Sequence, residues 1–318
     1  MSRKQSFTLL KIAVSLIAIA LIFTVVDLEG LTKELLTVNP WWLIVAIALV
    51  MFNIVPRAKR WQILLNALAI RVPLKELVTI YFIGSAFNNF LPSAVGGDAI
   101  RAMELRQHTD RVSDAITSVL VDRFLGLYGS IVLGIVALLF AWQIVPLIVL
   151  SSSLIVFVGM TTVGAILVHA PLYYALRRIS LIRFITDFKP LTKLFESFQG
   201  YPGSALWRAF GAGLLVNVIL IAINIAIGTG LGMAVSPLYY FVFIPLVNLS
   251  LVLPAFAGFG ARETAYIFLF AQVGVPEETA LALSLLIFAA GNLAPGLTGG
   301  VIYLWRNIRA LRMKEETR

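Results

Sequence analysis

The sequence predicts an all-α polytopic membrane protein, with about six full transmembrane helices and two re-entrant helical hairpins arranged as an inverted repeat. Hydrophobic residues make up 60% of the chain and charged residues 13%, against about 25% charged residues in soluble domains. Several apolar runs exceed the roughly 20 residues that cross a hydrocarbon core of about 30 Å. Two related Pro-Gly breaks also interrupt apolar segments that are too short to cross.

The two breaks share the pattern L-P-x-x-x-G-x-x-A, at residues 91–99 and 253–261. Such a break between two short apolar segments is typical of a chain that enters a bilayer and returns on the same side. An ordinary pair of short, kinked crossings is the alternative for each. The residues that we assign to the breaks are Pro92, Gly96, Gly97, Pro254, Gly258 and Gly260.

The predicted topology is a single transmembrane domain over residues 1–318. Its first inverted repeat covers 1–141 and its second covers 144–305. The six predicted crossings are 7–27, 41–65, 113–141, 144–169, 204–232 and 277–305. The predicted hairpins are 75–108 and 237–272. An odd number of crossings in each half gives the halves opposite orientations, and the tips of the two hairpins then meet near the middle of the membrane.

The basic residues support one orientation. With both termini cytoplasmic, the cytoplasmic stretches hold 21 of the 25 Lys and Arg residues, and the external loops keep only Lys33. We place Arg57, Lys59 and Arg60 on the cytoplasmic side in this count. The net charge of +9 is explained by a basic rim facing anionic lipid. Nucleic-acid or partner binding is the rival interpretation of the basic cytoplasmic loop 170–203; our prediction includes no nucleic-acid partner.

Six charged residues remain inside the predicted membrane region, and their charges sum to zero. They are Asp98, Arg101, Asp122, Arg123, Arg262 and Glu263. Each costs about 2.5–3.5 kcal/mol at the centre of an inserted helix, so such residues pair, face water or bind a ligand.

A functional and a structural interpretation both fit these charges. Asp98 and Arg101 are three apart and share a helix face, whereas Asp122 and Arg123 are neighbours that need partners elsewhere. Helices that start after Gly97 and Gly260 would aim N–H groups at a midplane cavity. Together with arginines, which grip phosphate bidentately, these ends would form a phosphate receptor. The alternative is a set of structural ion pairs that close the repeat interface.

Asparagines recur in the apolar segments. Asn88 and Asn89 precede the first break and Asn248 precedes the second, where they are candidates to cap broken helices or to line the substrate path. For Asn217 and Asn224 we favour hydrogen bonds between helices, worth around 0.6 kcal/mol each.

The last crossing and the helix ends carry further signals. Asn292 precedes Pro295 and Gly296, which predict a kink in the last crossing. Tryptophans are predicted to form interfacial belts at helix ends. They are Trp41, Trp42, Trp61, Trp142, Trp207 and Trp305.

The composition argues against chemistry that depends on cysteine or histidine side chains. The chain has no cysteine and two histidines, so we predict no disulfide, no metal site, no cofactor and no thiol nucleophile.

Three motifs resemble the lysylphosphatidylglycerol synthase transmembrane family, the flippase-like domain of the multiple peptide resistance factor. They are Asn-Asn-Phe-Leu-Pro-x3-Gly-Gly-Asp-x2-Arg at 88–101, Val-Asp-Arg-Phe-Leu-Gly-Leu at 121–127 and Pro-x3-Gly-x-Gly-x-Arg-Glu at 254–263. The resemblance implies a bacterial or archaeal inner-membrane domain that moves lipids between leaflets, often as a homodimer. It also implies that the six buried charges line a polar cavity. Because the chain ends at Arg318, we expect no soluble aminoacyl-transferase domain.

Three functions follow as hypotheses. The first, which we favour, is a lipid translocase without catalytic residues, whose partner is a membrane lipid with an anionic head group. The second is an intramembrane enzyme acting on lipid, with Asp98 and Glu263 as acid and base. The third is a scaffold that recruits a separate lipid synthase.

Overall fold

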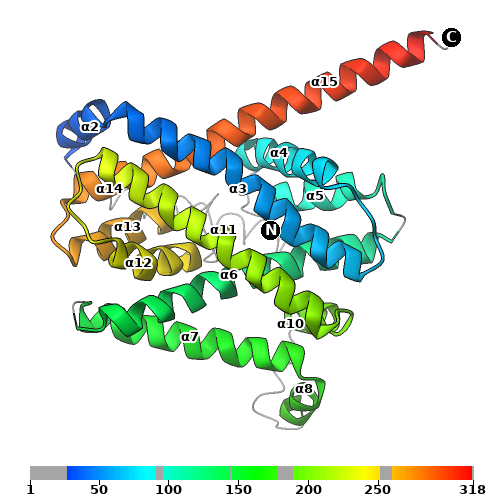
Figure 1. Ribbon diagram of the computed structural model, residues 1–318, viewed down its shortest axis with the longest axis horizontal. Coiled ribbons are helices and arrows are strands. Elements are labelled where there is room, and N and C mark those ends of the chain that lie inside the picture. The colour runs from blue at the N-terminus through cyan, green and yellow to red at the C-terminus, as the bar shows by residue number, and fades with distance from the viewer. Residues whose placement is uncertain are drawn as a thin grey trace, which may run out of the picture.

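Every regular element in the described part of the chain is a helix (Figure 1). The computed structural model describes residues 27–90, 96–109, 111–143, 145–177, 189–250 and 260–316. Within these ranges, five helical stretches are long and apolar enough to cross a membrane. The predicted class, a multi-pass α-helical membrane protein, is therefore confirmed.

The five long stretches correspond to five predicted crossings, with ends that differ by a few residues, except that the last helix continues to Glu316, beyond the predicted end at residue 305. They are α3 (Pro40–Ala67), α6 (Val112–Ala141), α7 (Leu147–Val168), α11 (Gly203–Gly230) and the continuous run of α14 (Glu277–Phe288), η1 (Ala289–Leu293) and α15 (Ala294–Glu316). Only the last residue of the predicted first crossing, 7–27, lies within the described residues.

Two pairs of short helices stand where the hairpins were predicted. They are α4 (Leu74–Phe90) with α5 (Gly96–Leu105), and α12 (Pro237–Ser250) with α13 (Ala261–Ala271). At 1.5 Å per residue, a helix of 10 or 11 residues is about 15 Å long, half of what a crossing needs. Both breaks therefore separate helices. Their tips, with Pro92, Pro254 and Gly258, lie outside the described residues.

Three further helices lie at the ends of the long ones. They are α2 (Leu28–Thr37), α8 (Ala170–Arg177) and α10 (Lys189–Gln199). Helix α2 packs against α14, and α10 packs against α6 and α7. The described parts of the predicted basic loop 170–203 are thus mostly helical, while residues 178–188 lie outside the described residues.

The most extensive helix contacts join segments far apart in the chain. Helix α3 packs against α11, α4 against α15, and α6 against α12 (Figure 1). Glycine allows the closest of these approaches. A Cβ atom on Gly299 of α15 would collide with the backbone of Phe82 in α4. The first hairpin closes in the same way, because a Cβ atom on Gly97 would collide with the carbonyl oxygen of Gly84.

The last crossing changes helix type where a kink was predicted. Residues Ala289–Leu293 form a π-helical turn, and Pro295 follows in the first turn of α15. Proline supplies no N–H donor, which favours a local widening of the hydrogen-bond ladder just before it. The amide of Asn292 donates to the carbonyl oxygen of Phe288 at 3.2 Å within this turn.

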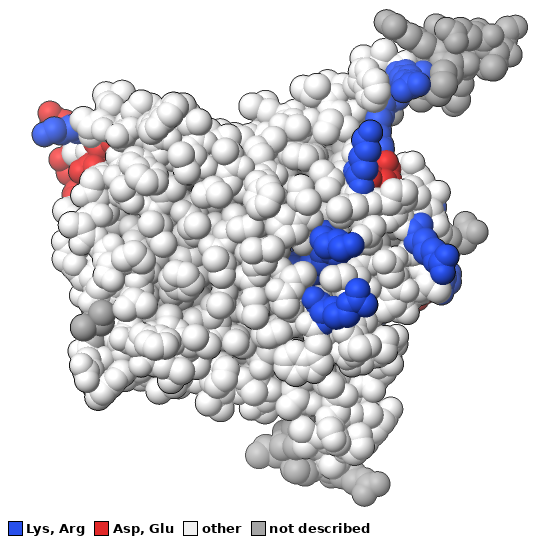
Figure 2. All heavy atoms as spheres, viewed as in Figure 1, with Lys and Arg blue, Asp and Glu red and all other residues white. Residues whose placement is uncertain are grey.

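Charged side chains gather at opposite ends of the long helices (Figure 2). One end carries α2 and the start of α14, where Thr279 donates to Glu34 at 3.1 Å. The acidic residues there are Asp27, Glu29, Glu34, Glu277 and Glu278. Exposed basic residues lie at the other end, among them Arg71, Lys75, Arg106, Arg111, Lys193 and Arg208. The face between the two ends is uncharged in this view, as expected of a surface that contacts lipid.

The described residues form three apolar clusters, of which the third packs α3, α6, α7, α8, α10 and α11 around Tyr173 and Phe198. The largest is built from α3, α6 and α11 to α14 at the acidic end and includes Phe243 and Phe270. A second cluster, around Trp61, Ile80 and Leu105, holds α3, α4, α5 and α6 together at the basic end. A group of buried polar residues lies among these four helices.

Candidate functional site

Asp122 is the centre of a buried ionic network. It lies about a third of the way along α6, with 2% of its surface exposed. Its Oδ1 accepts from the Nε of Arg60 at 2.7 Å, and its Oδ2 accepts from the hydroxyl of Tyr81 at 2.9 Å. The Nη2 of Arg101 also donates to Oδ2, at 3.2 Å. One carboxylate thus connects α3, α4, α5 and α6.

Asp98 extends the network toward the surface. Its Oδ1 accepts from the Nη1 of Arg101 at 3.1 Å, which confirms that these residues share a helix face. Its Oδ2 lies 3.2 Å from the Nη1 of Arg123. Arg101 therefore bridges both aspartates. Asp122 and Arg123, adjacent in sequence, take different partners, as the sequence predicted.

Aromatic rings enclose the bridging arginine. The guanidinium of Arg101 lies 3.9 Å from the ring centroid of Tyr81 and 4.3 Å from that of Trp61. Cation–π contacts of this kind strengthen when water is excluded. Trp61 is fully buried and its Nε1 donates to the Oγ of Ser118 at 3.0 Å. The prediction that Trp61 belongs to an interfacial belt is therefore wrong, because its ring packs against the network instead.

Two glycines make room for Arg60. A Cβ atom on Gly126 of α6 would lie 2.8 Å from the Nη1 of Arg60, and one on Gly213 of α11 would lie 3.5 Å from that nitrogen. The guanidinium thus occupies a slot between two helix backbones. Gly126 belongs to the same sequence motif as Asp122, so the motif encodes both the acid and the space for its partner.

The assignment of Arg57 and Arg60 to a cytoplasmic flank is corrected by the structure. Arg60 is buried in the ion pair with Asp122, and the Nε atom of Arg57 is buried with no hydrogen-bond partner. Both arginines lie inside α3, which continues to Ala67. Asn53, Arg57 and Arg60 have the spacing i, i+4, i+7, which places them on one helix face. We missed this polar stripe in the sequence analysis, although it would have identified Arg57 and Arg60 as candidate site residues. We also missed Tyr81.

These side chains line a cavity of about 500 Å³ between α3, α4, α5, α6 and α11. We call it the polar cavity. Among the described residues, four arginines and two aspartates line it, so positive charge exceeds negative charge by two. The charged lining residues are Arg57, Arg60, Arg101, Arg123, Asp98 and Asp122. Neutral polar residues complete the wall, among them Tyr81, Ser85, Asn88, Ser130, Asn217 and Asn248.

The structure brings together most of the predicted site residues of the first half. Asn88 and Asn248 also reach the polar cavity, and the amide of Asn248 donates to the Oγ of Ser130 at 3.2 Å. Asn89 lies on α4, but its side chain is outside the described part of the chain.

At each of the two helix starts, one N–H group that was predicted to be open is capped by a side chain. The N–H of Gly97, in the first turn of α5, donates to the Oδ1 of Asn88 at 2.6 Å. The N–H of Gly260, before α13, donates to the Oε2 of Glu263 at 2.8 Å. Gly260 has a φ of +88°, a conformation that glycine adopts without steric cost. Both N–H groups are therefore capped by the protein itself in this state.

Arg262 and Glu263 form a separate buried cluster in the second half. They pair with each other, and the Nε of Arg262 donates to the Oγ of Ser284 at 3.2 Å. The ring of Phe288 lies 4.7 Å from the guanidinium carbon. Neither residue is among the described residues that line the polar cavity. The predicted site thus divides into two clusters.

The two buried asparagines of α11, Asn217 and Asn224, connect helices, as predicted. Asn217 of α11 donates to the carbonyl oxygen of Gly126 in α6 at 3.0 Å. Asn224 accepts a hydrogen bond from the hydroxyl of Tyr266 at 2.6 Å, which ties α11 to α13. Asn217 contributes to the wall of the polar cavity as well.

Comparisons with known proteins agree with the motif resemblance. Residues 8–299 match the family described as the lysylphosphatidylglycerol synthase TM region. A UPF0104 membrane protein from Methanothermobacter thermautotrophicus is 25% identical to this chain over 130 residues, which is 40% of this chain and 38% of that relative. The match covers nearly the whole membrane domain and contains the residues of both clusters. The chain therefore belongs to the lysylphosphatidylglycerol synthase TM region family.

Proposed function

We propose that this protein is a translocase that moves a lipid with an anionic head group between the leaflets of the cell's inner membrane. The head group would pass through the polar cavity while the acyl chains stay in the bilayer. The single observation that carries the proposal is the excess of positive charge in the polar cavity, where Arg57 pairs with no acid among the described residues.

The pairing of the arginines supports an anionic substrate. Arg60, Arg101 and Arg123 each have an aspartate partner within 3.2 Å, whereas no hydrogen bond or ion pair joins Arg57 to another described residue. The buried Nε atom of Arg57 has no hydrogen-bond partner, which is costly unless a ligand accepts its hydrogen bond and supplies negative charge nearby. A phosphodiester fits, because guanidinium binds phosphate through two parallel hydrogen bonds.

The two aspartates have a different role in this proposal. They hold Arg60 and Arg101 in fixed positions and limit the excess charge of the empty cavity to two. A cavity with four unpaired arginines would bind an anion too tightly to release it. A transport site must bind its substrate weakly enough for it to leave.

The helix packing supports an inverted repeat. Exchanging the two halves maps α3 onto α11, α4 onto α12, and α6 onto the run from α14 to α15. Under that exchange the contact of α4 with α15 becomes the contact of α12 with α6, and both are among the most extensive. In transporters with such repeats, short broken helices meet at a site near the bilayer midplane. The basic end of the long helices would face the cytoplasm.

Leaflet exchange of a labelled lipid tests the proposal. The purified protein is placed in phosphatidylcholine vesicles with fluorescent phosphatidylglycerol, and a membrane-impermeant quencher reports the outer leaflet. We expect exchange by the wild type and at least a tenfold slower rate for Arg57→Ala, because a hydrogen bond to a charged group contributes about 1.5–3 kcal/mol. The control is Arg208→Ala, which removes an exposed arginine from the basic end of α11.

Other outcomes would point elsewhere. Equal rates for wild type and Arg57→Ala, with both proteins folded, would contradict a substrate site at Arg57. Conversion of the labelled lipid to a new product would favour the enzyme hypothesis. Absence of exchange in vesicles with and without imposed proton and sodium gradients would contradict the translocase and favour a scaffold for a separate synthase.

A further inference from the structure

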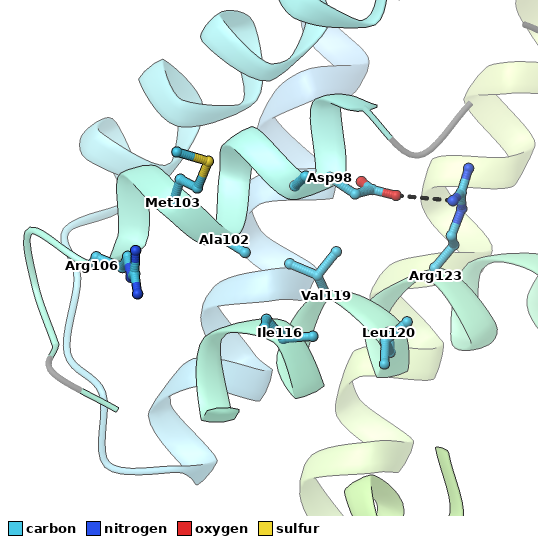
Figure 3. Close-up of a pocket in the computed structure, with 9 residues that line it drawn as sticks. Asp98, Ala102, Met103, Arg106, Ile116, Val119, Leu120 and Arg123 are labelled. Carbon is cyan, nitrogen blue, oxygen red and sulfur yellow. Dashed lines mark ion pairs between the residues drawn. The ribbon is translucent and has the colours of Figure 1, made fainter. Parts of the chain in front are cut away.

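A second hollow, of about 440 Å³, runs along the outside of the polar cavity between α5 and α6 (Figure 3). We call it the lateral groove. One wall is a stripe of α5 and the turn after it, and the other is a stripe of α6 with the same helical spacing. Its lining residues are Asp98, Ala99, Ala102, Met103, Arg106, Ile116, Val119, Leu120 and Arg123. Its volume falls within the range of ligand pockets, about 300–1,000 Å³.

The middle of the lateral groove is apolar and partly open. Ala102 and Val119 form a buried floor, whereas Met103, Ile116 and Leu120 are 57%, 50% and 37% exposed. In a soluble protein such a strip would be an exposed apolar patch. In a membrane protein it is a surface on which an acyl chain can lie.

Charge is confined to the two ends of this strip. Arg106 stands at the outer end, and the ion pair of Asp98 with Arg123 stands at the inner end (Figure 3). Asp98 and Arg106 are eight residues apart, which on a helix is about 12 Å. An anionic head group would therefore meet one arginine at the membrane surface and another at the inner end.

The inner end of the groove is also the wall of the polar cavity. Asp98 and Arg123 line both hollows, and their 3.2 Å contact joins α5 to α6 between them. The side chain of Arg123 is 42% exposed, so the pair lies at the open side of the helical bundle rather than in the apolar core. Asp98 keeps its second partner, Arg101, when this contact opens.

From this continuity we infer that the lateral groove holds one acyl chain of the transported lipid, and that its head group enters the polar cavity past the Asp98–Arg123 pair. The inference rests on the proposed function, because the polar cavity is taken as the head-group site. It adds a route: the substrate enters sideways from the bilayer, between the short helix α5 and the long helix α6.

A photoreactive lipid tests the position of the acyl chain without requiring transport. The wild type is placed in phosphatidylcholine vesicles with phosphatidylglycerol that carries a diazirine in mid-chain, illuminated, digested and mapped by mass spectrometry. We expect adducts to concentrate on Met103, Ile116 and Leu120. Leu139, 69% exposed farther along α6, reports ordinary contact with surrounding lipid.

A pair of bulky substitutions on α6 provides the matched control. Leu120→Trp fills the groove and should lower adduct yield at Met103 and Ile116 at least fivefold, whereas Leu139→Trp should not. Both variants should still bind sn-glycero-3-phosphoglycerol, a soluble head group without acyl chains, as strongly as the wild type does. Arg57→Ala should weaken that binding.

The outcomes separate this inference from the proposed function. Equal labelling at Leu139 and in the groove, or unchanged labelling in Leu120→Trp, would overturn the acyl-chain site while leaving the head-group site intact. Labelling concentrated in the groove, together with unchanged exchange by Arg57→Ala, would support the acyl-chain site and contradict the proposed head-group site.

Discussion

Arg60 and Asp122 are 62 positions apart in the sequence, and their side chains meet at 2.7 Å in the interior of the helical bundle. This contact fixes α3 against α6. Arg57, three residues earlier on the same helix face, forms no hydrogen bond or ion pair with another described residue, and its Nε atom is buried without a hydrogen-bond partner. Arg60 is therefore held by an acid within the described part of the chain, whereas we propose that Arg57 binds a ligand.

Asp122→Asn should lower the stability of the folded protein strongly. The change leaves Arg60 and Arg101 buried beside a neutral amide, and breaking a buried pair from one side costs about 3–5 kcal/mol. Asp114→Asn on the same helix is the matched control. Its partner Arg111 is 54% exposed, so we expect a loss of about 1 kcal/mol or less. Thermal unfolding in detergent measures both. Equal losses would show that the buried network contributes no more than a surface pair.

Gly126→Ala should displace Arg60 from its slot. The new methyl group would lie 2.8 Å from the guanidinium nitrogen, so the arginine or α6 must shift. We expect a lower unfolding temperature and weaker binding of sn-glycero-3-phosphoglycerol. Gly159→Ala in α7 is the control, because a Cβ atom there meets no atom within 4 Å. It should be neutral or stabilise by up to about 1 kcal/mol through higher helix propensity. A Gly126→Ala variant as stable as Gly159→Ala would contradict the assigned slot.

The long helices could be predicted from sequence because their signal is local. A run of apolar residues long enough to cross the bilayer specifies a helix by itself, since every backbone group must be bonded within the segment. The contact of Asp98 with Arg101 was predictable for the same reason: it spans one helical turn. The change of helix type just before Pro295 is also linked to a local feature, because the proline itself predicted a kink at this place.

Contacts between different helices could not be predicted in this way, because no local sequence pattern specifies them. We expected Asp122 to pair with a residue far away in the sequence, but no sequence pattern identified that residue as Arg60. Arg57 and Arg60 flank Lys59, which is exposed, and a count of charge by position along the chain groups all three as a cytoplasmic cluster. Only their positions around the helix distinguish Arg57 and Arg60, which share one face, from Lys59. Trp61 was misassigned for a related reason, because proximity to a predicted helix end does not reveal which neighbours surround the ring.

Glu263 should contribute to stability in two separable ways. It pairs with Arg262 and caps the N–H of Gly260, so Glu263→Ala removes both interactions. Glu263→Gln removes the charge but can keep the cap, because glutamine also serves at this position of a capping box. We expect Glu263→Ala to unfold at the lower temperature, with the two variants differing by about 1 kcal/mol. Identical unfolding temperatures would show that the cap contributes nothing. Glu196→Gln, exposed on α10, is the control for loss of charge alone.

Glu104→Gln should stabilise the protein increasingly as the pH rises. Glu104 follows the first break near the basic end, and partial burial, aided by nearby Glu76, raises its pKa despite an opposing effect of Arg306. A carboxyl group with a raised pKa in the folded state ionises more readily in the unfolded chain, so its ionisation lowers stability above the unfolded-state pKa. The difference in unfolding temperature between Glu104→Gln and wild type should therefore grow between about pH 4 and pH 7. Glu196→Gln, exposed on α10, should show no such growth. A difference that shrinks with rising pH would mean that the contact with Arg306, 3.9 Å away, outweighs the cost of burial.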